Sequence, residues 1–143
     1  MVQLWIDIDE SVDLMEFFKE DHPELRKIAL LDLITNNTDR KIGHLIPTAD
    51  GRVFGCDHGV TFHEEDKLRT VLWQWSSESF SEGELEILRL AALLLGAEKR
   101  DVVLGLIEEE ELEAALNRID RALKAGTFPE PSEDWPAVPW PPF

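Results

Sequence analysis

The chain has 143 residues, of which 43% are hydrophobic and 31% charged, a composition typical of one globular domain large enough for a hydrophobic core. Its 30 acidic residues outweigh 14 basic ones and give a formal net charge of −16, which excludes non-specific nucleic-acid binding as a function because phosphate backbones are also negative. A single cysteine, Cys56, rules out an intrachain disulfide, and no apolar run reaches the roughly 20 residues of a membrane span. We therefore expect a soluble, cytoplasmic protein.

The amino-terminal part of the sequence predicts one strand and two helices. Alternating large apolar residues predict a strand over residues 2–8, and apolar residues at helical spacing predict a short helix over residues 10–20. The next helix begins with Asp21 and Glu24 in the relation of a capping box, and it carries a mostly apolar sequence to about Thr35. We expect that helix to be buried.

A β-hairpin is predicted from His44 to Cys56, because two apolar runs flank the dipeptide Asp50-Gly51, which is typical of tight turns. Residues 60–80, which follow, show no regular period. The hairpin is the only strand pair that the sequence predicts, so the expected fold class is α+β and mostly helical.

Three helices are predicted in the carboxy-terminal half. Ser81 and Glu84 form a capping box at the start of an apolar helix that we expect to end at Gly96. A helix over residues 99–107 follows, and an amphipathic pattern predicts the last helix over residues 109–125.

The last residues, 128–143, hold six of the eight prolines and therefore form neither a helix nor a central strand. Two tryptophans and two phenylalanines in the same stretch are unlike a free linker. We expect an extended tail over residues 128–143 that packs against the helices of a lobe formed by residues 1–127.

Polar residues are concentrated between the second helix and the hairpin. Because a hairpin brings the ends of its strands together, His44 at its start should lie close to Asp57 just after its end. Asp39, five residues before His44, can reach the same place. The rim of this cluster would hold Asn37, Arg40 and Lys41.

Two carboxylates and an imidazole beside cations suit a metal–phosphate site. Mg²⁺ takes a few hard oxygen ligands from a protein and accepts phosphate oxygens for the rest. A second carboxylate can orient an attacking hydroxyl group, and nearby cations can offset charge on a phosphoryl group. The alternative is a hairpin whose polar ends only make ordinary turn hydrogen bonds.

A family resemblance favours the metal–phosphate interpretation. The segments "DRKIGH" and "DHG" resemble the catalytic and metal-binding segments of the phosphatidylinositol 3-/4-kinase-like superfamily. The longer segments "NNTDRKIGHLI", "GCDHGVTFHEEDKLRTVLWQW" and "DWPAVPWPPF" are similar to an uncharacterised actinobacterial family of kinase-like proteins. The likeness covers almost the entire chain, and the three segments together are specific.

The resemblance implies a protein-kinase-like carboxy-terminal lobe that uses ATP with Mg²⁺ or Mn²⁺, with the hairpin at its active site. Asp39 matches the catalytic aspartate and Asp57 the metal-binding one, with Asn37 in support and Arg40 and Lys41 near the phosphate or the Asp39 loop. His44 stands where the superfamily has a metal-binding asparagine, which favours a softer metal such as Mn²⁺ or weak activity.

The chain contains no glycine-rich loop and nothing that resembles an ATP-anchoring lysine on an early strand, so the resemblance implies that the amino-terminal lobe is missing. The chain would then be a truncated form or a natural short form, and the phosphate acceptor stays open. A second hypothesis is a catalytically inactive, pseudokinase-like scaffold that binds another protein or a second copy of itself. A third is a metal-dependent hydrolase that uses the same two aspartates.

Overall fold

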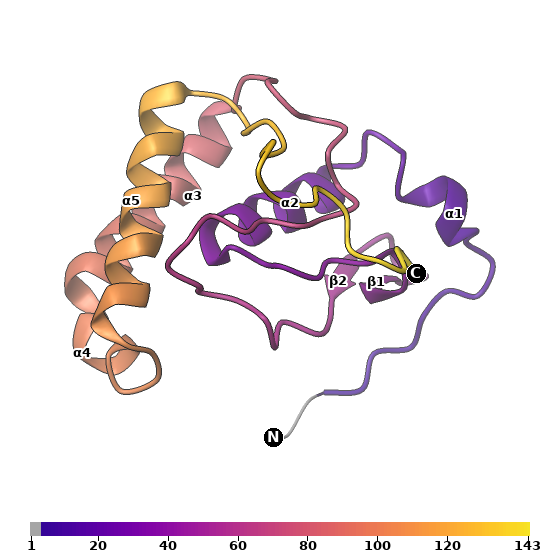
Figure 1. Cartoon of the computed structure of the whole chain (residues 1–143). Coiled ribbons are helices and arrows are strands. Elements are labelled where there is room, and N and C mark those ends of the chain that lie inside the picture. Colours follow the sequence, from indigo (N-terminus) through magenta and orange to yellow (C-terminus); the bar gives the residue numbers. More distant parts are fainter. Residues whose placement is uncertain (1–3) are drawn as a thin grey trace.

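In the computed structural model, which describes residues 4–143, the chain is mostly helical and contains one small antiparallel sheet. Helices α3 and α5 lie side by side and contact central helix α2, whose other side meets the β1–β2 hairpin (Figure 1). Within the described residues, no helix is both long and apolar enough to cross a bilayer. The elements in chain order are α1 (Leu14–Phe17), α2 (Pro23–Thr35), η1 (Ile42–His44), β1 (Leu45–Pro47), β2 (Val53–Gly55), α3 (Glu82–Leu93), η2 (Leu94–Glu98), α4 (Arg100–Val103) and α5 (Glu109–Ala125). The mixed, mostly helical fold class is therefore confirmed.

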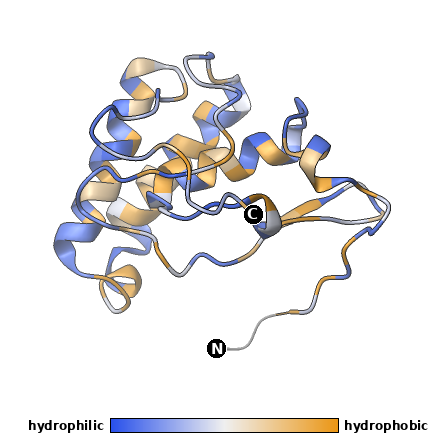
Figure 2. Cartoon of the chain, turned by 45° about the vertical axis from the view of Figure 1, so that its right-hand side comes forward, coloured by the Kyte–Doolittle hydropathy of each residue, from blue (hydrophilic) through white to orange (hydrophobic). Residues whose placement is uncertain are grey.

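Helix α2 is the centre of the core. It buries apolar side chains around most of its circumference, which Figure 2 shows as an apolar stretch through the middle of the molecule. Each large apolar side chain removed from water contributes about 1.5–3 kcal/mol. The buried residues of α2 that join the core are Leu25, Ile28, Ala29, Leu30, Leu33 and Ile34.

Helix starts and turns with a clear chemical signal form as predicted. The Ser81 hydroxyl accepts a bond from the Glu84 backbone at 3.3 Å, and the Glu84 carboxylate accepts one from the Ser81 backbone at 2.7 Å. Gly126 ends α5 in a left-handed conformation with φ 72°, which glycine adopts at little cost. The Asp50-Gly51 turn joins β1 and β2, with φ 80° at Gly51.

Helix α2 begins near the predicted position, but its capping residue differs from the predicted one. Its first residue is Pro23, and the capping side chain is His22, whose Nδ1 accepts a bond from the Glu24 backbone at 3.2 Å. The Asp21 carboxylate instead accepts a bond from the indole Nε1 of Trp75 at 3.0 Å. A long-range partner has therefore replaced the local cap.

The strand predicted over residues 2–8 does not form over residues 4–8, which have no regular secondary structure. Residues 2 and 3 lie outside the described part of the chain. Alternation favours a strand only when a partner strand is available, and the nearest ladder-like contact is one bond from Asp9 N to Pro47 O at 2.8 Å. Leu4 and Trp5 are 79% and 85% exposed. The helix expected over residues 10–20 is reduced to the single turn of α1.

Gly96 does not end a helix as predicted. The chain continues from α3 into the π-helix η2, which contains Gly96. A Cβ at this position would lie 3.6 Å from the Leu116 side chain of α5, so this glycine lies where η2 packs on α5. The helix expected over residues 99–107 is also shorter than predicted, because only α4 is helical.

The proline-rich tail packs on the rest of the chain. Phe128 lies in the core with the Arg26 guanidinium of α2 over its ring, and the later tail residues bond to an irregular segment and to η1. The Ala137 carbonyl accepts bonds from Thr70 N at 3.1 Å and from the Trp73 indole at 2.8 Å, and the Pro142 carbonyl accepts one from Ile42 N at 2.9 Å. In Figure 1 the tail crosses the molecule from the end of α5 and finishes beside the hairpin. It therefore holds the segment around residues 70–73 and η1 in place.

Candidate functional site

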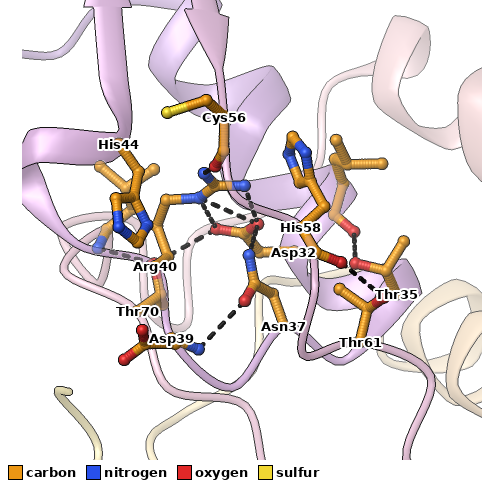
Figure 3. Close-up of polar contacts among 12 residues, drawn as sticks. Asp32, Thr35, Asn37, Asp39, Arg40, His44, Cys56, His58, Thr61 and Thr70 are labelled. Carbon is orange, nitrogen blue, oxygen red and sulfur yellow. Dashed lines mark hydrogen bonds and ion pairs between the residues drawn. The ribbon is translucent and has the colours of Figure 1, made fainter. Parts of the chain in front are cut away.

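The polar loop between α2 and η1 is built on a buried ion pair between Asp32 and Arg40, whose side chains are both 0% exposed (Figure 3). Arg40 Nε donates to Asp32 Oδ2 at 3.0 Å, and Arg40 Nη2 donates to Asp32 Oδ1 at 2.8 Å. The Asp32 oxygens also accept bonds from Asn37 Nδ2 at 2.9 Å and from the Thr70 hydroxyl at 3.4 Å. Several hydrogen bonds therefore compensate the cost of burying both charges.

This network also fixes the backbone that carries both candidate aspartates. Arg40 Nη1 donates to the Cys56 carbonyl at 2.8 Å, directly before Asp57. The Asn37 side-chain oxygen accepts a bond from the Asp39 backbone at 3.0 Å. The two aspartates are thus carried by segments that one buried network holds together.

Arg40 and Asn37 have a different place from the one expected. Both are buried, at 0% exposure, and both bond within the network, so neither side chain is accessible to a phosphate group or a metal ion in this structure. Both side chains turn inward because the Asp32 carboxylate is buried on the core side of the loop, and a buried charge needs an ion-pair partner and hydrogen-bond donors. The sequence analysis missed Asp32, although a lone carboxylate inside the apolar run "LLDLIT" is a signal for a buried polar partner.

Asn36, also missed, organises the irregular segment that follows Asp57. It adopts a left-handed backbone with φ 54°, and its side-chain amide donates to the carbonyls of His63 at 2.9 Å and Glu65 at 2.7 Å. Its oxygen accepts a bond from Lys67 N at 3.0 Å. Three of the six polar residues in this loop, Asn36, Asn37 and Arg40, are thus buried.

His44 and Asp57 come together as the hairpin geometry predicted. His44 Nε2 lies 3.7 Å from Asp57 Oδ2, with the histidine 15% and the aspartate 60% exposed. The Lys41 backbone donates to His44 Nδ1 at 3.5 Å, which in the neutral imidazole leaves the proton on Nε2, facing Asp57. Asp57 itself has a left-handed backbone with φ 54°, uncommon for a residue other than glycine.

Asp39 pairs with a different neighbour. Its carboxylate lies 3.5 Å from Lys41 Nζ, and Figure 3 shows it pointing away from the Asp32–Arg40 pair. Among the described residues, no group of three or more histidine, cysteine, aspartate or glutamate side chains could hold a metal ion. The expected single cluster of Asp39, His44 and Asp57 is therefore corrected to two pairs, Asp39–Lys41 and His44–Asp57.

A cavity of about 830 Å³ lies between residues 4–8 and the end of the hairpin. Most of its wall is apolar, and its ionisable groups are those of Cys56, Asp57 and His58. Partial burial lowers the pKa of His58 and raises the pKa of Cys56, so at neutral pH this wall presents a neutral imidazole and a neutral thiol. The lining residues are Leu4, Trp5, Ile6, Ile8, Ile46, Gly55, Cys56, Asp57, His58 and Gly59.

The chain resembles a known mycobacterial protein over most of its length. No protein-family model matches the chain, and no solved structure matches it. The chain is 36% identical over 135 residues to Protein Rv2133c of Mycobacterium tuberculosis, a match that covers 94% of this chain and 48% of the relative. The chain thus spans about half the length of that relative, whose name states no activity.

Proposed function

We propose that the chain is the nucleotide- and metal-binding lobe of a kinase-like phosphotransferase that uses ATP with Mg²⁺ or Mn²⁺. One observation carries the proposal: the apolar cavity of about 830 Å³ contains Asp57 in its wall. That volume is in the range of small-molecule sites, which are mostly apolar with a few polar groups that orient the ligand. A nucleotide fits this chemistry, with its base against the apolar wall and its phosphates toward Asp57.

Asp57 and His44 are the residues that would hold the metal. A set of two protein donors suits Mg²⁺ or Mn²⁺ on a nucleotide, because phosphate oxygens and water complete the coordination. The metal, when bound, would neutralise phosphate charge. In the neutral form described above, His44 carries its proton on Nε2 and would donate a hydrogen bond to Asp57 or to a phosphate. Nε2 would become a metal ligand only if it lost that proton.

Asp39 and Lys41 form the second functional pair in this proposal. Both side chains are partly exposed, at 32% and 22%, so a substrate can reach them. Asp39 would orient the hydroxyl group of the phosphate acceptor, and Lys41 would offset phosphate charge.

The proposed lobe needs a second lobe to complete it. Leu4 and Trp5 line the cavity yet are 79% and 85% exposed, as expected of a surface that another part of a kinase-like enzyme covers. The relative is about twice as long as this chain, so it has residues enough for such a lobe.

The same exposed side chains favour a second candidate, a catalytically inactive scaffold that binds another protein or a second copy of itself. Trp140, in the tail, is also 85% exposed. Exposed apolar patches commonly mark interaction surfaces. The two candidates differ in whether the cavity binds a nucleotide.

The test is a titration of the whole chain with ATP in the presence of Mg²⁺ or Mn²⁺, followed by calorimetry and thermal unfolding. We expect a saturable heat and a rise in midpoint temperature, because a ligand that binds only the folded state stabilises it. Asp57→Ala should abolish both, and Asp101→Ala, which removes the same charge from exposed α4, should leave them unchanged. A wild-type chain that binds no nucleotide–metal pair but self-associates would favour the scaffold.

A further inference from the structure

A second cavity, of about 480 Å³, lies between the last turns of α5, residues 66–77 and the first residues of the tail. It shares no lining residue with the cavity beside Asp57. Its volume is also in the range of small-molecule sites. Its apolar wall includes Leu33, Leu68, Trp73, Ala122, Phe128 and Pro129.

Arg118 of α5 lines this cavity and is only 4% exposed. Its Nη1 donates to the His63 carbonyl at 3.1 Å, but Nε and Nη2 have no hydrogen-bond acceptor among the described residues. These two nitrogens share one edge of the guanidinium, the edge that binds a carboxylate with two parallel hydrogen bonds. A buried charge with missing partners is costly, and such a group in a folded protein calls for an explanation.

The acids in the cavity wall do not supply the missing acceptor. Asp66 pairs with Arg121 at the rim, where both side chains are more than half exposed. The Glu130 carboxylate accepts a bond from the Ser77 hydroxyl at 2.7 Å. The edge of Arg118 therefore lacks a partner although two carboxylates line the same cavity.

We propose that this cavity binds a small monocarboxylate with an apolar or aromatic body, whose carboxylate receives the two hydrogen bonds from Nε and Nη2 of Arg118. The apolar wall selects the body of the ligand, and Trp73 and Phe128 favour an aromatic ring. The nearby charges of Asp66 and Glu130 disfavour a dianion such as a phosphate monoester. Because the edge is covered in this structure, the ligand must displace a wall side chain as it enters.

The test uses 3-phenylpropionate as a probe, with its uncharged amide as the matched ligand, and measures affinity by calorimetry and by changes in amide NMR signals. The wild-type chain should bind the carboxylate and bind the amide roughly 10- to 100-fold more weakly, the factor expected for losing charge-assisted hydrogen bonds. Signals of residues around Arg118 should change, and those around Asp57 should not.

Three variants separate this site from a purely structural arginine. Arg118→Met should lose the preference for carboxylate over amide while unfolding at the same or a higher temperature, because it removes a buried charge that lacks partners. Ala125→Phe, which places a ring at the cavity wall near the end of α5, should weaken binding of both probes. Lys124→Gln, a charge loss on the same helix outside the cavity, should change neither.

Two results would overturn the proposal. One is a wild-type chain that binds neither probe at millimolar concentration, which would indicate that only water satisfies Arg118. The other is an Arg118→Met chain that still prefers the carboxylate.

Discussion

Replacement of Arg40 by methionine is the perturbation that most sharply separates the structural role of the polar loop from a catalytic one. The change keeps much of the side-chain volume and removes the guanidinium. It leaves the Asp32 carboxylate buried, at 0% exposure, with only Asn37 and Thr70 as donors. It also leaves the Cys56 carbonyl without its bond from Arg40.

The expected cost is large. Breaking a buried ion pair by removing one partner destabilises a protein by about 3–5 kcal/mol, and total stabilities are about 5–15 kcal/mol. With a urea dependence of about 2 kcal/mol per molar, the unfolding midpoint should fall by about 2 M. Lys41→Met is the matched control, because Lys41 is partly exposed and lies 3.5 Å from its partner, Asp39. It should cost less than about 1 kcal/mol.

Urea unfolding of the single variants and of Asp32→Leu/Arg40→Met provides the measurement. The double variant should cost at least about 2 kcal/mol less than the sum of the single ones, because removing both charges removes the uncompensated one. A cost below about 1 kcal/mol for Arg40→Met, together with weaker ATP binding, would refute this reasoning. That result would return Arg40 to the phosphate contact that the sequence suggested.

Three further predictions concern contacts around the same core. Gly55→Ala should lower the free energy of unfolding by about 1–3 kcal/mol, because the new Cβ would lie 3.3 Å from both Arg40 Nη1 and His58 Nε2. An unchanged midpoint of urea unfolding would contradict that packing. Partial burial lowers the pKa of His58, so the folded state favours the neutral imidazole. The contribution of this residue to stability should be complete above a pH of about 6.5 and decrease as the pH falls toward the folded-state pKa. His58→Gln should flatten that fall in pH-dependent thermal unfolding, and an equally steep fall in the variant would refute it. Arg26→Met should lower the free energy of unfolding by about 1–3 kcal/mol, because Arg26 Nε bonds to the Glu84 carboxylate at the start of α3 at 2.6 Å. Lys27→Met removes only an exposed ion pair and should lower it by less than about 1 kcal/mol. Equal losses in urea unfolding would contradict a stabilising role for the Arg26–Glu84 bond.

Signals carried by a few adjacent residues were enough to predict part of this fold. The Ser81–Glu84 capping box, the stop at Gly126 and the Asp50-Gly51 turn depend on local backbone chemistry, and all three form. Hairpin closure then brings His44 and Asp57 together, which needs no knowledge of the rest of the chain.

The features that failed depend on partners far away in the sequence. Residues 4–8 have a strand-like pattern but no strand to pair with among the described residues. Asp21 has the sequence of a cap but bonds to Trp75, 54 positions away. Arg40 lies in a motif that suggests a ligand contact, yet it faces a carboxylate inside α2 whose orientation only the folded helix reveals.

The most direct test of the proposed function is to locate bound Mn²⁺ by paramagnetic broadening of amide NMR signals, with Mn²⁺ and ATP added at substoichiometric concentrations. The account predicts that the first signals to broaden are those of Cys56, Asp57 and His58, together with His44, and that Asp57→Ala removes the effect. Broadening centred on the acidic start of α5, or none at any residue near Asp57, would contradict it.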